Sequence, residues 1–178
     1  MERMRQSISA LGGLFDSLLD ISRLDAGVVE NNTKDLHLPR LVESMRQEFR
    51  RNAEAKGIEL LANCQDEVVA ADPVILERIL RNLLSNAIRY TEQGSVTLRC
   101  ERAGSQVRID VADTGIGIPE AQHQKIFSEY HQLHNPERDR TKGLGLGLAI
   151  VQRLCRLSGF DLRLRSAPGA GATFSVLV

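Results

Sequence analysis

The chain has 178 residues, of which 42% are apolar and 26% are charged, and 23 lysines and arginines balance 23 aspartates and glutamates. Its length allows one domain with a buried core plus an additional element, and its composition is typical of a soluble globular protein. The balanced charge and the 4% of aromatic residues, with no tryptophan, argue against a nucleic-acid-binding protein. Such a protein needs a basic surface or a platform on which bases stack.

The three cysteines, Cys64, Cys100 and Cys155, are far apart in sequence and form no CxxC pair. Their spacing predicts neither a zinc site nor a disulfide framework, so each is expected to be a small core residue in a reducing compartment. No apolar run is long enough to cross a membrane, and no signal peptide opens the chain. We therefore expect a cytoplasmic location, while a longer parent protein with a membrane anchor elsewhere remains open.

The first predicted element is a helix from residue 1 to about residue 26, which Gly27 ends as a C′ glycine. Its apolar stripe is too wide for a lone surface helix and predicts partner helices, as in a bundle. The alternative is a helix that packs on its own domain. We accordingly place a helical unit at residues 1–28 and the main domain at residues 29–178. The apolar residues of the stripe are Met4, Ile8, Leu11, Leu14, Phe15, Leu18, Leu19, Ile21 and Leu24.

Helical and strand-like periodicity alternate along the rest of the chain. Asp72 is the expected N-cap of one helix, and Pro73 is its first residue. A long polar loop at 128–142 is expected to be a functional lid. The order of elements predicts an α+β fold, a two-layer sandwich with helices on one face of a mixed, mostly antiparallel sheet. Helices are predicted at 38–56, 73–90, 119–127 and 146–158, and strands at 58–62, 68–71, 95–102, 106–112, 161–165 and 173–177.

The helix predicted at 73–90 carries two asparagines, Asn82 and Asn86, four residues apart and therefore on one face, with Arg89 and Tyr90 one turn further on. Asparagine favours helix ends over helix interiors, so two on one face of a leucine-rich helix call for partners. An amide oxygen can bind Mg²⁺ without adding charge, which leaves the phosphates of a ligand to supply the anionic oxygens. The alternative is a pair of buried structural amides.

A second segment, from Asp113 to Pro119, stands at a predicted strand end and contains Gly115 and Gly117. Glycines there allow a ligand to approach the backbone. An ionised aspartate only accepts hydrogen bonds, so Asp113 suits the exocyclic amine of adenine, whereas guanine presents a carbonyl oxygen and is repelled. The alternative is an ordinary Asp-Gly-type turn.

A third segment alternates glycine and leucine and runs into an apolar helix. Free N–H groups and the positive end of a helix form a cradle for phosphate. The alternating glycines differ from the dinucleotide-binding fingerprint, and no Gly-Lys-Ser/Thr follows as in a P-loop. The segment comprises Gly143, Leu144, Gly145, Leu146, Gly147 and Leu148.

Together these segments resemble the N, G1 and G2 boxes of the ATP-binding domain of sensor histidine kinases, in the same order and at similar spacing. Ile126, Phe127 and Tyr130 resemble the F box, and residues 169–174 resemble the last glycine box. The resemblance covers residues 38–178, and residues 18–27 resemble the end of the second helix of the dimerisation and phosphotransfer hairpin. It implies the Bergerat-type ATP-binding fold that gyrase-type ATPases share.

The resemblance implies ATP and Mg²⁺ as cofactors. It assigns Asp113 to the adenine amine, with Thr173 nearby through water, Tyr90 beside the base, and Asn86 to the metal ion. The phosphates would be faced by Asn82 and Arg89, wrapped by the glycine run, and reached from the lid by Lys142 or Arg140. The complete implied nucleotide-binding set is Asn82, Asn86, Arg89, Tyr90, Asp113, Gly115, Gly117, Ile118, Arg140, Lys142, Gly143, Leu144, Gly145, Leu146, Gly147, Leu148 and Thr173.

The implied function is transfer of the ATP γ-phosphoryl group to a histidine of a dimerisation domain, for relay to an aspartate of a response-regulator receiver domain, within a homodimeric parent protein. Related hydrolases carry a glutamate four residues before the magnesium-binding asparagine. Here that residue is Asn82, which cannot take a proton, so hydrolysis is expected to be slow. Two alternatives remain: a hydrolytic ATPase clamp of the gyrase type and a non-catalytic, ATP-dependent interaction module.

No residue of the chain is assigned as the phosphoryl acceptor. The acceptor motif of the family is a helical histidine followed by an acidic and a basic residue, and none of the four histidines has this setting. Each is expected to be a surface or packing residue, and the chain is expected to bind ATP without phosphorylating itself. The four are His37, His123, His131 and His134.

Overall fold

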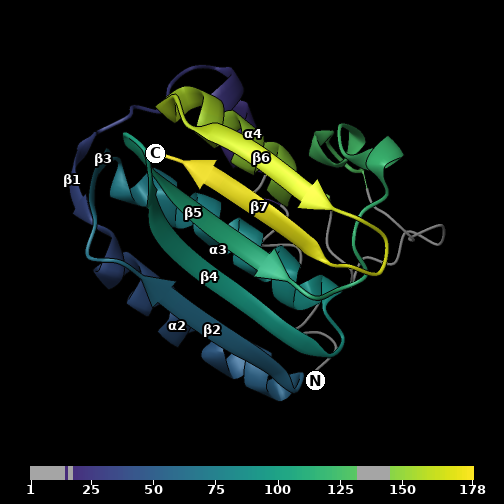
Figure 1. Ribbon diagram of the computed structural model, residues 1–178. Coiled ribbons are helices and arrows are strands. Elements are labelled where there is room, and N and C mark those ends of the chain that lie inside the picture. The colour runs from purple at the N-terminus through teal and green to yellow at the C-terminus, as the bar shows by residue number, and fades with distance from the viewer. Residues whose placement is uncertain (1–14, 16–17, 132–144) are drawn as a thin grey trace, which may run out of the picture.

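The computed structural model describes Phe15, residues 18–131 and residues 145–178. A five-stranded sheet has the order β2-β4-β5-β7-β6, in which only the β2–β4 pair is parallel. Three helices, α2, α3 and α4, cover one face of this sheet, and the other face is open (Figure 1). This confirms the predicted two-layer α+β sandwich with a mixed, mostly antiparallel sheet.

The observed bounds agree with the predicted elements at most positions. The structure adds a strand, β1, that pairs with β3 in a small antiparallel sheet, and it resolves the short helix expected after Pro119 into two 3-10 turns. The elements are β1 (Lys34–His37), α2 (Leu38–Ala55), β2 (Ile58–Cys64), β3 (Val68–Ala71), α3 (Pro73–Tyr90), β4 (Gly94–Ala103), β5 (Gln106–Asp113), η1 (Glu120–Gln122), η2 (Lys125–Phe127), α4 (Gly147–Ser158), β6 (Asp161–Ser166) and β7 (Ala172–Leu177).

Helix α3 is the central element of the helical layer, and its start is fixed by the predicted N-cap. The Asp72 carboxylate accepts hydrogen bonds from the backbone N–H groups of Val74 and Ile75 at 2.8 and 3.2 Å, and Pro73 occupies the first turn. These bonds satisfy N–H groups that have no partner within the helix. The apolar side of α3 then packs into the core through Ile75, Leu76, Ile79, Leu80, Leu83, Leu84, Ala87 and Ile88.

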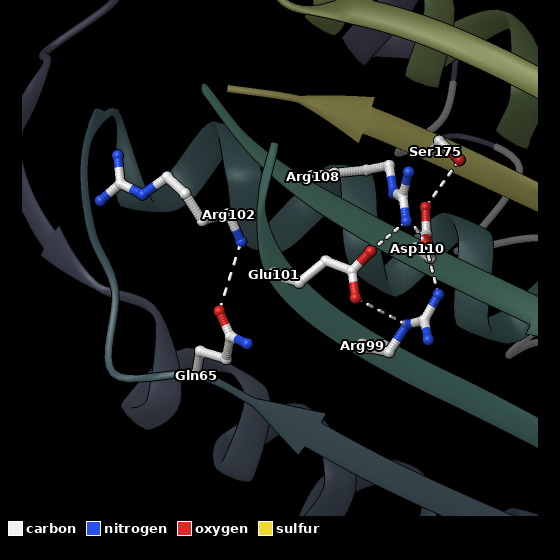
Figure 2. A network of polar contacts seen from close by, with 7 residues as sticks. All are labelled: Gln65, Arg99, Glu101, Arg102, Arg108, Asp110 and Ser175. Atoms are coloured by element: carbon white, nitrogen blue, oxygen red, sulfur yellow. Dashed lines mark hydrogen bonds and ion pairs between the residues drawn. The ribbon is translucent and has the colours of Figure 1, made fainter. Parts of the chain in front are cut away.

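The open face of the sheet carries a network of charged side chains around Asp110, which is only 6% exposed (Figure 2). Its carboxylate accepts a hydrogen bond from the Ser175 hydroxyl at 2.6 Å and pairs with Arg108 at 3.1 Å and Arg99 at 3.4 Å. Glu101 pairs with both arginines. A buried carboxylate is tolerated only when it is paired, so this network fixes the lateral register of β4, β5 and β7.

The N-terminal helix packs on the domain through residues 20–25. Ile21 is buried at 7% exposure, and Leu24 is partly buried against the same core. Asp20 forms an ion pair with Arg78 of α3. This part of the predicted stripe therefore contacts its own domain, which agrees with the alternative that the helix packs on its own domain instead of on partner helices.

Other apolar residues of the same helix remain uncovered, with Phe15, Leu18 and Leu19 exposed at 61%, 38% and 40%. These are the residues that partner helices would cover. Met4, Ile8, Leu11 and Leu14, on which the bundle prediction also rests, lie outside the described residues.

All three cysteines are free, with Cys100 and Cys155 buried and Cys64 half-buried. Burial is the main cause that raises the pKa of each thiol, to about 12 for Cys155. The thiols are therefore held in the neutral form and pack as small apolar groups, as predicted. Among the helices within the described residues, none has the length and apolar character needed to span a bilayer.

Candidate functional site

A cleft opens where the C-terminal half of α3 faces the loop after β5 and the start of α4. The cleft is partly open to solvent. Six of its lining residues belong to the predicted nucleotide-binding set: Asn86, Tyr90, Asp113, Gly117, Ile118 and Leu148. The structure therefore brings residues from three separate sequence segments into one cavity.

Asp113, the last residue of β5, is held in a fixed orientation at the cleft. Its Oδ1 atom accepts hydrogen bonds from the N–H groups of Gly115 at 2.9 Å and Ala172 at 3.2 Å. In the described part of the chain, no group donates to Oδ2. Burial raises the pKa of this carboxyl above its usual range, and the two backbone hydrogen bonds partly offset the rise. One carboxylate oxygen thus remains available as an acceptor for a ligand.

The glycines after Asp113 allow segments of the backbone to approach one another. A Cβ atom at Gly115 would lie 2.3 Å from the carbonyl oxygen of Tyr90, and one at Gly117 would lie 1.9 Å from that of Ala167. The Ile118 N–H donates to the Ser166 hydroxyl at 2.8 Å, which joins this loop to the β6–β7 turn. Ligand access is the role expected of these glycines from the sequence, but close backbone packing already requires them here.

Gly171 offers the sharpest test of this packing. Its φ is 71°, and a Cβ atom would lie 1.9 Å from the carbonyl oxygen of Asp113. Gly171→Ala is expected to lower the free energy of unfolding by about 2–4 kcal/mol, because left-handed strain adds to a backbone overlap. The matched control is Gly169→Ala, where φ is 74° and nothing lies within 4 Å, with an expected loss of about 1–2 kcal/mol. Urea denaturation measures both, and equal losses would contradict the packing argument.

The two asparagines of α3 occupy different environments. Asn86 lines the cleft, and its amide makes no hydrogen bond to any residue that the structure describes. Asn82 lies one turn earlier, where its amide donates to the carbonyl oxygen of Arg78 at 2.9 Å. A Cβ atom at Gly147 would lie 2.9 Å from the Asn82 side-chain oxygen. Asn82 therefore lies against the first residue of α4, outside the cleft lining, while its amide N–H is bonded within α3.

The glycine run is described from Gly145 onward, and Arg140, Lys142, Gly143 and Leu144 lie outside the described residues. Gly145 has a φ of 70° and lies against the backbone of His131, so that a Cβ atom would be 2.6 Å from its carbonyl oxygen. Leu146 is buried, and Leu148 lines the cleft. Arg89 is exposed at the end of α3.

Thr173 is a predicted site residue that the structure does not bring into the cleft. Successive side chains of a strand point to opposite faces, and the cleft is lined by the residues on either side, Ala172 and Phe174. The backbone N–H of Ala172 contacts Asp113, and Phe174 packs edge-on against Phe127 with 6.5 Å between ring centroids.

Sequence reasoning missed six residues of the lining. Strand alternation in 172–177 was the available signal for two of them, because it places residues 172 and 174 on the inner face. Ile116 lies within the glycine-containing segment 113–119, Ile126 belongs to the residues that resemble the F box, and Ala87 is the helical neighbour of Asn86. For His131 no signal existed, because a single histidine is not specific. The missed residues are Ala87, Ile116, Ile126, His131, Ala172 and Phe174.

Residues 71–178 match the sequence profile of the family described as histidine kinase-, DNA gyrase B-, and HSP90-like ATPase. The chain belongs to this family. Within the family it is a catalytic domain of the histidine-kinase type, as the relatives below indicate. The assignment made from the boxes is thereby confirmed.

Two curated relatives are similar over nearly the whole chain. The circadian input-output histidine kinase CikA of Synechococcus elongatus is 36% identical over 189 aligned positions, which cover 99% of this chain and 25% of CikA. The virulence sensor protein BvgS of Bordetella bronchiseptica is 36% identical over 179 aligned positions, which cover 96% of this chain and 14% of BvgS. The chain thus spans a quarter or less of these two relatives.

Two solved structures have the same fold. Full-length ShkA in complex with AMPPNP superposes with a TM-score of 0.86 at 31% identity, covering 99% of this chain and 37% of ShkA. The catalytic domain of the histidine kinase ThkA superposes with a TM-score of 0.72 at 26% identity, covering 83% of this chain and 95% of that domain.

Proposed function

We propose that this chain is the catalytic domain of a sensor histidine kinase and that it donates the γ-phosphoryl group of ATP to a histidine on a dimerisation domain. The phosphoryl group is then relayed to an aspartate of a response-regulator receiver domain. The observation that carries the proposal is the lining of the cleft. Asp113 is the only carboxylate among the described residues that line it, and it occupies the adenine end. The described lining thus offers no carboxylate other than Asp113 as a base for water, and its one histidine, His131, is hydrogen-bonded through Nε2 to the side-chain oxygen of Gln122 at 3.1 Å.

The position of Asn82 supports transfer over hydrolysis. A neutral amide cannot accept a proton, and this amide is already engaged with the carbonyl of Arg78 and packed against Gly147. A hydrolytic clamp needs a proton acceptor beside the attacking water. Transfer to a histidine supplied by another domain needs none from this chain, because it depends mainly on positioning and on stabilisation of charge.

The cleft fits ATP with Mg²⁺. The described residues contain no group of three or more histidine, cysteine, aspartate or glutamate side chains that could hold a metal ion. The amide of Asn86, which has no hydrogen bond to any described residue, would hold a magnesium ion as one neutral ligand, with phosphate and water oxygens supplying most of the others. The ion would supply neutralisation of charge at the phosphates.

The other nucleotide contacts follow from the arrangement of the cleft. Tyr90 and Ile118 line the same cleft as Asp113, and we assign them to the adenine ring. We assign the start of α4, where Gly145 and Gly147 lie, to the phosphates. We assign Arg89 and, from the lid, Arg140 and Lys142 to phosphate contacts by analogy with the family. For Thr173 the proposed contact is the one that the family resemblance implies, a water-mediated contact near the adenine amine.

The parent protein is proposed to be a homodimer joined through the N-terminal helix. The support is the uncovered apolar surface at Phe15, Leu18 and Leu19. A helix at the surface of a monomer normally keeps such residues against a core. A partner helix from a second copy would bury them.

Binding of ATP with Mg²⁺ is expected to stabilise the chain, and GTP is expected to do so far less. A ligand at a hundredfold excess over its Kd adds about 2.7 kcal/mol to the free energy of unfolding. Guanine places a carbonyl oxygen where Asp113 needs a donor. Thermal denaturation with each nucleotide measures the difference. Equal shifts with ATP and GTP would contradict the role of Asp113.

A further inference from the structure

The C-terminal end of α3 lacks the usual termination. Many helices end with a glycine in the left-handed conformation after the last turn. Here the residue after α3 is Thr91, with an extended backbone at φ −99° and ψ 123°. The last carbonyl groups of a helix have no partner within it and must find one elsewhere.

Two of these carbonyls are satisfied by other parts of the backbone or by Thr91. The Ala87 carbonyl accepts from the backbone N–H of Thr91 at 3.1 Å and from its hydroxyl at 2.7 Å. The Tyr90 carbonyl accepts from the N–H of Ile116 at 3.4 Å, in the loop that follows Asp113. The carbonyls of Ile88 and Arg89 lie between these two.

A single side chain from another part of the chain takes both remaining carbonyls. The Lys56 ammonium donates to the carbonyl oxygens of Ile88 at 2.7 Å, Arg89 at 3.0 Å and Thr91 at 2.9 Å. An ammonium group has three donors, and all three are used on the backbone of this one helix end. A cation at this position also interacts favourably with the negative end of the helix dipole.

The turn after α2 brings Lys56 to this position. Lys56 is the C-cap residue of α2, and the left-handed Gly57, with φ 69°, directs the chain into β2. The first residue of β2, Ile58, pairs with Gly94 at the start of β4. The α2–β2 turn is therefore fixed beside the α3–β4 connection, 32 residues or more away in sequence from the carbonyls that it serves.

The helix end that Lys56 holds carries one wall of the cleft. Asn86 and Tyr90 line the cleft from the last turn and a half of α3. The Tyr90 carbonyl also contacts the loop that positions Asp113, since a Cβ atom at Gly115 would lie 2.3 Å from it. A shift of this helix end would therefore move both walls relative to each other.

We propose that Lys56 is a positioning residue for the nucleotide site. It fixes the last turn of α3 so that Asn86 and Tyr90 face Asp113 across the cleft. Lys56 itself lies outside the cleft lining, and its three hydrogen bonds to α3 and Thr91 all go to backbone carbonyls. This inference rests on the proposed nucleotide-binding function.

The test compares Lys56→Met, which keeps most of the aliphatic stem and removes the three donors, with Lys34→Met at an exposed position on β1. Calorimetry at a temperature where every variant is folded gives the Kd for ATP with Mg²⁺. Lys56→Met is expected to weaken binding about three- to tenfold, and Lys34→Met is expected to match the unmodified chain. Lys56→Arg, which retains a cation with several donors, is expected to recover part of the loss.

A purely structural cap would lower the melting temperature of Lys56→Met and leave the Kd unchanged, and this result would overturn the proposal. Amide NMR of the nucleotide-free protein gives an independent readout. Lys56→Met should shift the backbone signals of Gly115 and Ile116, which Lys56 does not touch. Failure of the unmodified chain to bind ATP would refute the proposed function, while unchanged signals at these two residues would refute the role of Lys56. If Lys56→Met does not fold, the Kd for ATP and the signals of Gly115 and Ile116 are measured on Lys56→Arg instead. The planar guanidinium cannot reproduce all three bonds, so a Kd and signals equal to those of the unmodified chain would refute the role of Lys56.

Discussion

Replacing Asp113 with asparagine is expected to weaken ATP binding by about ten- to a hundredfold. A hydrogen bond to a charged acceptor contributes about 1.5–3 kcal/mol, and about 1.4 kcal/mol corresponds to a tenfold change in affinity. Asparagine keeps an oxygen for the N–H groups of Gly115 and Ala172, but it turns an NH₂ group toward the adenine amine. Calorimetry with ATP and GTP is the measurement. A variant that still prefers ATP by the original margin would contradict the assignment.

The stability of the same variant serves as the control. Burial raises the pKa of the Asp113 carboxyl in the folded protein, so folding disfavours its ionised form. The group therefore lowers stability at pH values above its folded pKa, and this penalty disappears as the pH falls through that pKa. Asp113→Asn is accordingly expected to leave the nucleotide-free protein at least as stable at neutral pH. A large loss of stability would mean that weak binding reports unfolding.

The raised pKa also has a consequence for ligand binding. Because Asp113 must be ionised to accept from the adenine amine, ATP affinity should begin to fall at a higher pH than for an ordinary aspartate. The Asp113→Asn variant, which cannot titrate at this position, should lack that fall. Kd values measured in steps from neutral to mildly acidic pH compare the two profiles.

The chain is expected to bind ATP and yet place no phosphoryl group on its own histidines. An acceptor must lie in line with the γ-phosphate at about 3–3.5 Å. His37 lies at the start of α2 and pairs with Asp66 at 2.7 Å, and the ring of His123 bonds to the carbonyl of Ile118 at 3.1 Å. Neither lines the cleft. His134 lies outside the described residues.

Among the described histidines, His131 is the one that could contradict the expected lack of autophosphorylation, because it lines the cleft. Its ring is hydrogen-bonded to the side-chain oxygen of Gln122 at 3.1 Å, and it does not lie on a helix. Incubation with γ-labelled ATP, followed by an acid-stability check, detects phosphohistidine, which is acid-labile. No label is expected on the purified chain. Label that His131→Ala removes and His37→Ala retains would show that the acceptor lies within this domain.

Transfer should appear when a separate helical hairpin with an acceptor histidine is added. The label is then expected on the hairpin, at a low rate because the two must first associate. Asp113→Asn should reduce it in proportion to the lost ATP affinity. Release of free phosphate should stay slow throughout, since Asn82 cannot act as a base. Rapid phosphate release that does not depend on the hairpin would favour a hydrolytic ATPase.

The fold could be predicted where local chemistry determines an element. Asp72 followed by Pro73 specifies a helix start in any context, and it is found as expected. Asp113 followed by Gly115 likewise specifies a turn in which a carboxylate bonds to the backbone two residues on. The sequence also contains the alternation that marks β7, but the family resemblance drew attention to Thr173 and away from Ala172.

Contacts between distant segments could not be predicted. The strand β1 has four residues and exists only because β3 pairs with it. Lys56 resembles any exposed lysine at the end of a helix until the carbonyls of Ile88 and Arg89 are placed beside it. Likewise, Gly147 appeared to serve phosphate alone, whereas the side chain of Asn82 lies against it. Such roles depend on tertiary packing, which a single sequence does not encode locally.

The place of β7 in the sheet has a consequence for synthesis and for truncation. This strand is the last of the described strands in sequence, yet it lies in the interior of the sheet between β5 and β6. The sheet is therefore incomplete until residue 177 has left the ribosome. Removal of residues 172–178 would strip away an internal strand, leaving β5 and β6 with unpaired edges that invite aggregation. It would also remove the N–H of Ala172 that holds Asp113.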